Sequence, residues 1–231
     1  MTEPRKARAP APVVGNRLVA HLQQRAEEER ARISRMLHHD VSGMLAAARM
    51  DLSRLMTRVA AEGDLPEQLR RVDQLLERVI GDARAEMQRL HPALIDHFGL
   101  PVALRHLIEE RCRRPGCRFT VELVDESEGL VAPLPMATYR TVEALLADDG
   151  LQDFTANFGP RRDGYLLELA LSPFPANPDP ARVDDLRALR AWVEELGATW
   201  KESRRDKQWL IELRLPRRPA ASLDAALAPG G

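Results

Sequence analysis

Two adjacent histidines followed by an aspartate, His38, His39 and Asp40, are the residues of this chain best suited to chemistry. A neutral imidazole nitrogen is a nucleophile near neutral pH, so it can accept a phosphoryl group and return it. Phosphoryl transfer depends mainly on positioning and on charge neutralisation, which makes nearby cations relevant. Arg35 lies about one helical turn before His38, and Arg49 lies about three turns after it.

The residues around these histidines predict one helix that buries one side. Apolar residues recur at spacings of three and four, and they are Ile33, Leu37, Val41, Met44, Ala48, Leu52 and Leu55. At about 100° per residue, His38 lies roughly 90° from the centre of this apolar face, whereas His39 points away from it. Ser42 and Arg49 share the strip of His38. The pattern therefore places His38 at the edge of a packed face.

This stretch resembles the dimerisation and phosphoacceptor helix of nitrate-sensor-type bacterial histidine kinases. The family pattern is Arg-Ile-Ala-Arg-Glu-Leu-His-Asp-x-x-Gly-x-x-Leu, and residues 32–45 align with it without gaps. In this register the resemblance implies that His38 is the phosphoacceptor, with His39 at the family's acidic position and Ser42 at its glycine. Residues 47–52 continue the match as Ala-Ala-Arg-Met-Asp-Leu, with arginine for the family's lysine.

A second register makes His39 the phosphoacceptor. Residues 39–43 read His-Asp-Val-Ser-Gly and reproduce the family's local His-Asp-x-x-Gly signature. This register needs a one-residue insertion upstream and a compensating deletion downstream, and an insertion rotates the rest of a helix by about 100°. We therefore favour His38, with Asp40 as the group that orients a ring nitrogen. The residues expected to position the partner or the phosphoryl group are Arg35, Ser42 and Arg49.

The chain between residues 15 and 100 is predicted to form a helical hairpin for dimerisation and phosphotransfer. Its first helix spans about residues 16–61 and its second about residues 66–90. Two helices alone leave much of their apolar stripes in water, which favours a dimeric four-helix bundle. Residues 90–104 resemble the family segment Leu-Arg-Pro-x-x-Leu-Asp-x-x-Gly-Leu-x-x-Ala-Leu, with His91 in place of the arginine.

Residues 101–216 are predicted to form an α/β lobe. The expected strands are 118–124, 165–171 and 209–215, and the expected helices are 101–113, 134–148 and 184–196. This order resembles the ATP-binding lobe of histidine kinases. The predicted fold class is therefore α+β: an N-terminal helical hairpin that forms a dimeric four-helix bundle, then a degenerate ATPase-like lobe. We expect the tryptophans to fill its core rather than to line a pocket, and they are Trp192, Trp200 and Trp209.

The lobe lacks the residues with which the histidine kinases that it resembles bind ATP. Ala144 stands at the family's glutamate and Asp148 at its magnesium-binding asparagine; with one deletion, Glu143 and Ala147 stand there instead. The family's Asp-x-Gly-x-Gly is replaced by Ser-Pro-Phe-Pro-Ala-Asn-Pro-Asp-Pro at residues 172–180. Phosphates are bound by backbone amides that proline lacks and that a Cβ keeps at a distance. We therefore predict that this chain holds no cofactor, and that Mg²⁺ comes from the partner.

The composition indicates which partners and which cellular compartment to expect for this protein. The 231 residues carry a net charge of −1, which argues against nucleic acid or an anionic membrane as the main partner. No apolar run reaches the length of a membrane span, and two cysteines in an Arg-Cys-Arg-Arg-Pro-Gly-Cys segment suit a reducing compartment, so we expect a cytoplasmic protein. Residues 1–14 are expected to be a disordered leader and residues 217–231 a flexible tail.

These features predict a two-component signalling protein. The main hypothesis is a homodimeric histidine phosphotransferase that exchanges phosphoryl groups with response-regulator receiver domains and does not use ATP. The alternative is a non-catalytic, pseudokinase-like adaptor that docks a response regulator or a sensor histidine kinase. The two hypotheses share a fold and a docking surface, and they differ in whether His38 or His39 carries phosphate.

Overall fold

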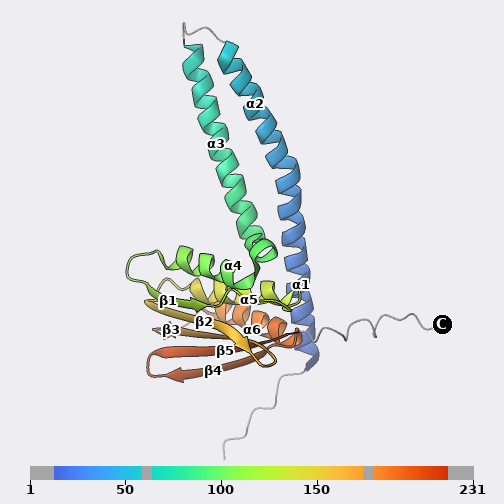
Figure 1. Cartoon of the computed structure of the whole chain (residues 1–231), viewed down its shortest axis with the longest axis vertical. Helices are drawn as coiled ribbons and strands as arrows, with labels where there is room; N and C mark the ends of the chain where they lie inside the picture. The colour runs from blue at the N-terminus through green and yellow to red at the C-terminus, as the bar shows by residue number, and fades with distance from the viewer. Residues whose placement is uncertain (1–12, 59–63, 174–178, 218–231) are drawn as a thin grey trace, which may run out of the picture. The chain divides into compact units, whose positions relative to one another are not determined.

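The computed structural model describes residues 13–58, 64–173 and 179–217. It confirms the predicted α+β class, with a helical hairpin followed by a lobe built on a five-stranded sheet. The chain divides into two compact units, one of residues 25–93 and one of residues 13–24 together with 94–217 (Figure 1). The predicted leader and most of the predicted tail lie outside the described residues.

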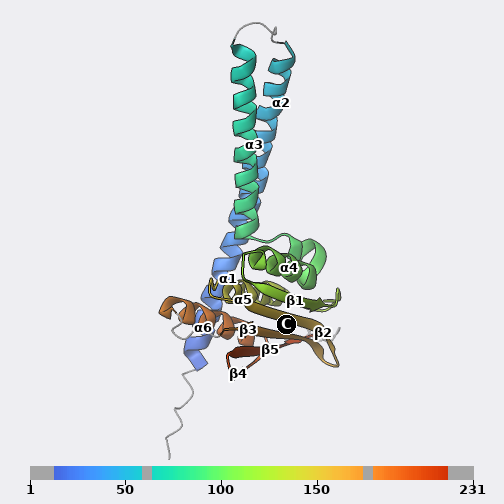
Figure 2. The ribbon, with the colours of Figure 1, turned by 90° about the vertical axis from the view of Figure 1, so that its left-hand side faces the viewer.

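The hairpin consists of a long first helix with one irregular turn and a second helix that returns beside it. The first helix comprises α1 (Val13–Met36), the π-helical turn η1 (Leu37–Val41) and α2 (Ser42–Arg58). The returning helix is α3 (Leu65–Leu90), which carries Pro66 in its first turn, where a missing N–H costs nothing. Figure 1 and Figure 2 both show α2 and α3 running side by side.

The predicted apolar face of the first helix is only partly the face that packs. Leu52 is buried and Leu45 is half-buried, but the side chains of Met44 and Leu55 are 66% and 52% exposed in the single chain. A single chain therefore leaves Met44 and Leu55 on its surface, as expected where two helices alone do not cover their apolar stripes. One neighbouring helix covers a narrower strip than the apolar residues occupy, so the remainder stays on the surface.

The lobe is a mixed sheet covered on one face by helices, as Figure 1 shows. The strands lie in the order β1-β2-β3-β5-β4; β1 and β2 are parallel, and the other neighbours are antiparallel. The helices are α4 (Leu94–Cys112), α5 (Leu134–Leu146) and α6 (Pro180–Glu195). The strands are β1 (Arg118–Leu123), β2 (Asp153–Arg161), β3 (Gly164–Ser172), β4 (Thr199–Arg205) and β5 (Gln208–Pro216).

The core of the lobe lies between the sheet and the helices. Its largest fully buried side chains include Leu104, Ile108, Phe154, Trp192 and Leu213. α4 has a kink at Gly99, which adopts a φ of 78° that a residue with a Cβ rarely takes. The expectation that Trp192 fills the core is confirmed.

The Cys112 thiol, at the end of α4, offers a direct test of this packing. Burial raises the pKa of the Cys112 thiol to about 12, with a smaller contribution from a hydrogen bond to Cys117. Since the thiolate is the reactive form, we expect iodoacetamide at mildly alkaline pH to label native Cys112 roughly a hundredfold more slowly than the urea-unfolded chain. Mass spectrometry of the labelled peptides measures both rates. Equal rates would show that α4 does not bury this thiol.

Candidate functional site

The π-helical turn η1 carries the two histidines and the aspartate. The backbone N–H of Ser42 donates to the carbonyl of Leu37, which is the i→i+5 hydrogen bond of a π-helix. Such turns are rare, and many of them occur at functional sites. The turn exposes His38, His39 and Asp40 together. All three of these predicted site residues are thus exposed on the turn.

Both imidazoles are available to a second protein. Within the described part of the chain, neither His38 nor His39 has a hydrogen bond, an ion pair or a ring contact. Both side chains are exposed, whereas the helical pattern favoured His38 as the residue at the edge of the packed face. A π turn takes up an extra residue within a helix, which removes the main physical objection to the register that uses His39.

The predicted positioning residues fall into two groups. Arg35 is exposed about one turn before the histidines, and Ser42 is half-buried directly after the π turn. Arg49 instead joins α2 to α3, because its guanidinium lies 3.0 Å from Asp73 and 3.5 Å from Glu77. The hydrogen bond with Asp73 raises the pKa of Arg49, so this cation is already engaged inside the hairpin.

A surface groove between α2 and α3 lies beyond the π turn along the same hairpin. Its lining is apolar, with charged side chains among it: Ala46, Arg49, Met50, Ser53, Glu77, Ile80, Gly81 and Arg84. Sequence reasoning missed this groove, because its lining depends on which faces of the two helices meet. The small residues Ala46 and Gly81 are the only sequence signal, since short side chains leave room between neighbouring helices.

The base of the hairpin holds a buried carboxylate that sequence reasoning also missed. Glu27 on α1 is buried, and its carboxylate lies 3.1 Å from the guanidinium of Arg30 and 3.6 Å from Nδ1 of His91. Nearby, the hydroxyl of Ser34 donates to the carbonyl of Met87 at 3.1 Å. These contacts join the first helix of the hairpin to the end of its second helix, and they involve His91.

Asp148 and Glu143 of the lobe are both paired with arginines. The carboxylate of Asp148 is paired with Arg182 at 3.1 Å, and the same guanidinium donates to the carbonyl oxygens of Ala144 and Leu145. Glu143 is likewise held by Arg140 at 2.8 Å. The two acids that the alternative alignments place at the family's asparagine and glutamate are thus both paired with arginines. In the ranges that the structure describes, no group of three or more His, Cys, Asp and Glu side chains is placed to bind a metal ion.

Comparison with known proteins gives only structural neighbours. No family model matches the sequence, and no curated protein matches it. The histidine kinase domain of the blue-light-activated histidine kinase EL346 from Erythrobacter litoralis is 12% identical, with a TM-score of 0.40 over 77% of this chain and 94% of that one.

Two further structures give similar values. A longer EL346 structure is 13% identical, with a TM-score of 0.43 over 76% of this chain and 58% of that one. The histidine kinase AdeS of Acinetobacter baumannii is 11% identical, with a TM-score of 0.39 over 76% of this chain and 96% of that one.

In the described part of this chain, no helix combines the length and the apolar character needed to span a bilayer.

Proposed function

We propose that this chain is a histidine phosphotransfer protein of two-component signalling. It accepts a phosphoryl group from the aspartyl phosphate of a response-regulator receiver domain, and it returns the group without using ATP. The observation that carries this proposal is the exposure of two imidazoles, free of other bonds, on a π-helical turn of a long hairpin. A protein partner can reach either imidazole without any rearrangement of the hairpin.

The proposed step is a transfer between nitrogen and oxygen. The lone pair of one imidazole nitrogen attacks the phosphorus of the partner's aspartyl phosphate, and the other ring nitrogen keeps its proton during the attack. A P–N bond forms as the P–O bond breaks, and the aspartate leaves as a carboxylate with the electron pair. The partner's Mg²⁺ neutralises charge on the phosphoryl oxygens. Return of the group to a receiver is the same step in reverse.

The charges around η1 suit this step. The exposed guanidinium of Arg35 is placed one turn away, where it can attract a negatively charged phosphoryl group or the acidic pocket that carries it. Asp40 follows His39 directly, and its carboxylate is the candidate to accept a hydrogen bond from a ring N–H. Arg49 contributes less directly, by holding α2 against α3 through Asp73.

The groove between α2 and α3 supports the proposal by offering a partner a surface on the same hairpin, which begins at Ala46, seven residues beyond His39. Apolar side chains such as Met50 and Ile80 line it, and Arg84 adds positive charge. A receiver that placed an apolar side chain in this groove and acidic groups at its edge would be oriented toward the π turn.

We propose that the protein acts as a homodimer in the cytoplasm.

The donor of the phosphoryl group is the first thing to test. The purified chain is incubated with a labelled, phosphorylated receiver from a co-encoded regulator, and separately with γ-labelled ATP and Mg²⁺. We expect label on the chain from the receiver only, with the acid lability and base stability of a phosphohistidine. Unphosphorylated receiver mixed with labelled inorganic phosphate is the control.

Two results would contradict the proposal. Label from ATP would show that the lobe binds nucleotide in spite of the Asp148–Arg182 pair. A stable complex with the receiver but no label from either donor would make the chain an adaptor instead.

A further inference from the structure

Two cysteines lie at the two ends of the turn that joins α4 to β1, and the proposed phosphotransfer does not use them. Cys112 is the last residue of α4, and Cys117 directly precedes the first residue of β1. They are the only cysteines of the sequence, and both are free thiols. Both belong to the unit formed by residues 13–24 and 94–217, so the pair is complete within that unit.

The backbone of this turn brings Cys117 back to the end of the helix. The N–H of Cys117 donates to the carbonyl of Arg114 at 3.3 Å, and Gly116 adopts a φ of 84°, which reverses the chain at low steric cost. Both cysteines reach the same hydrophobic core, since Cys112 is buried in it and Cys117 packs against it. A hydrogen bond joins the two thiols, so the sulfurs are already neighbours.

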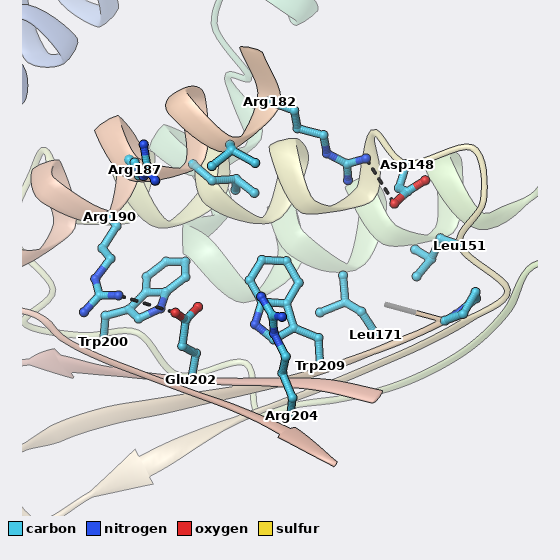
Figure 3. A pocket seen from close by; sticks show the side chains of 13 residues that line it. Asp148, Leu151, Leu171, Arg182, Arg187, Arg190, Trp200, Glu202, Arg204 and Trp209 are labelled. Carbon is cyan, nitrogen blue, oxygen red and sulfur yellow. Dashed lines mark ion pairs between the residues drawn. The ribbon is translucent and has the colours of Figure 1, made fainter. Parts of the chain in front are cut away.

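The turn is anchored to the segment between α5 and β2. The guanidinium of Arg114 lies 3.1 Å from the carboxylate of Asp149, and it also donates to the carbonyl of Asp148. Asp148 is in turn paired with Arg182 of α6, at the cavity between α6 and the strands that Figure 3 shows. These contacts hold the turn in the conformation that keeps the two thiols at close range.

The two thiols differ in their access to a reagent. Cys112 is only 2% exposed, and its burial raises the pKa of this thiol to about 12. Cys117 is half-buried, and its neighbours Gly116 and Arg118 are exposed. A thiol reacts with an oxidant as a thiolate that the oxidant can reach. Cys117 is therefore the thiol that an oxidant contacts first.

We propose that Cys112 and Cys117 form a reversible intramolecular disulfide when the reduced chain is exposed to a small disulfide, and that Cys117 reacts first. A disulfide carries no charge, so it suits the buried position of Cys112 better than a thiolate does. The bond closes the loop of residues 112–117 and joins the end of α4 to the edge strand β1. The inference goes beyond the proposed phosphotransfer and does not depend on it.

The reaction consists of two successive thiol–disulfide exchanges. The thiolate of Cys117 attacks one sulfur of the oxidant, whose S–S bond breaks as the new S–S bond forms, and the leaving thiolate takes up a proton from water. The thiol of Cys112 then gives up its proton and attacks the Cys117 sulfur, and the second thiolate leaves with that proton. The cysteine pair is oxidised by two electrons, and the oxidant is reduced to two thiols. Contact between the sulfurs offsets the low acidity of Cys112 in the second exchange.

Mass spectrometry of the full chain tests the proposal with oxidised glutathione as the probe. The reduced protein is incubated with the probe at mildly alkaline pH, quenched with acid at set times and digested. We expect the wild type to lose the mass of two hydrogen atoms, with Cys112 and Cys117 in linked peptides of the same chain. At early times we expect glutathione on Cys117 and not on Cys112. Dithiothreitol is expected to restore both thiols.

Two alanine variants separate the roles of the two thiols. Cys112→Ala and Cys117→Ala each leave one cysteine and add no polar group to the core. We expect Cys112→Ala to accumulate the mixed disulfide of Cys117 with glutathione, because no second thiol is present to displace it. We expect folded Cys117→Ala to react roughly a hundredfold more slowly, because its remaining thiol is buried. Circular dichroism checks the fold of both variants, and the early wild-type samples give the same assignment without any substitution.

The proposal is overturned by any of four results. These are free thiols in the wild type under conditions that oxidise the urea-unfolded chain, a disulfide between chains in place of one within a chain, glutathione on Cys112 before Cys117, or equal rates in the two folded variants. Because these samples contain no phosphoryl donor, failure of the proposed phosphotransfer leaves the results unaffected, and the reverse also holds.

Discussion

Replacing the phosphoacceptor histidine with alanine is expected to reduce phosphoryl transfer from the receiver by about a thousandfold or more. Alanine removes the nucleophile itself, and loss of a nucleophile is among the largest effects of single substitutions on a reaction. Both histidines of η1 are exposed and alanine favours helices, so neither variant is expected to unfold the hairpin. The measurement is the initial rate of label transfer from the phosphorylated receiver, with wild type, His38→Ala and His39→Ala compared at equal concentration.

The two single variants separate the two registers. We expect His38→Ala to remove transfer and His39→Ala to retain most of it, because the ungapped match to the family pattern places the phosphoacceptor at residue 38. The opposite result would assign the reaction to His39, with Asp40 as its acidic neighbour. His106→Ala is the matched control, since His106 is an exposed helical histidine of the lobe. Undiminished transfer in both single variants and in their double variant would refute phosphotransfer at η1.

The hairpin was accessible to sequence reasoning because long amphipathic helices have a strong period. The predicted second helix, residues 66–90, agrees with Leu65–Leu90 to within one residue. The π turn was not predicted, since an average period of 3.6 residues is insensitive to one wider turn. The wide turn matters for the site, because it changes the argument that separated His38 from His39.

The lobe shows where local patterns fail. Strands β1, β3 and β5 were predicted, but β2 and β4 were missed. β2 contains Asn157, Gly159 and Pro160, which are weak strand formers, and it is held by pairing with strands on both sides. β4 is an edge strand with a single buried residue, Trp200, so its sequence lacks the apolar alternation of a half-buried strand.

The residues of the candidate sites also differ in how far the sequence alone indicates their role. The histidines were singled out by their residue type and by the resemblance of the surrounding stretch to a family motif, which are local properties of the sequence. The engagement of Arg49 with Asp73 depends on how α2 meets α3, and such pairing is not written in either helix by itself. Trp200 lies in the core as expected and Trp209 packs against it. The sequence did not indicate that both also line a cavity beneath α6, because that depends on how the helix and the sheet meet.

The second prediction with a large expected effect concerns the dimerisation of the hairpins. Val72, Leu75 and Val79 form a stripe on α3 at spacings of three and four, and each is at least 44% exposed in the single chain. Exposed Met44 and Leu55 add apolar surface on α2. Burying each such side chain contributes about 1.5–3 kcal/mol, so pairing of two hairpins through this surface would bury a substantial apolar area. We therefore expect a dimer in solution.

A charge in this stripe is expected to break the dimer. Leu75→Glu places a carboxylate in the apolar contact of both copies, where desolvation and repulsion between like charges oppose association. Gln74→Glu makes the same charge on the neighbouring, exposed position outside the stripe and is expected to remain dimeric. Sedimentation velocity at micromolar concentration measures the mass of each protein. A monomeric wild type, or a dimeric Leu75→Glu protein, would show that the hairpins do not associate through this stripe.

The same variant also shows whether one hairpin is sufficient for the reaction. The exposed histidines of η1 and the groove between α2 and α3 come from a single chain, and Leu75 is not among the residues that line the groove. We therefore expect monomeric Leu75→Glu to accept phosphoryl groups at close to the wild-type rate per chain. A large loss of transfer with an unchanged helical content would mean instead that the second hairpin supplies part of the site, because the substitution leaves the imidazoles and their surroundings on the first hairpin intact.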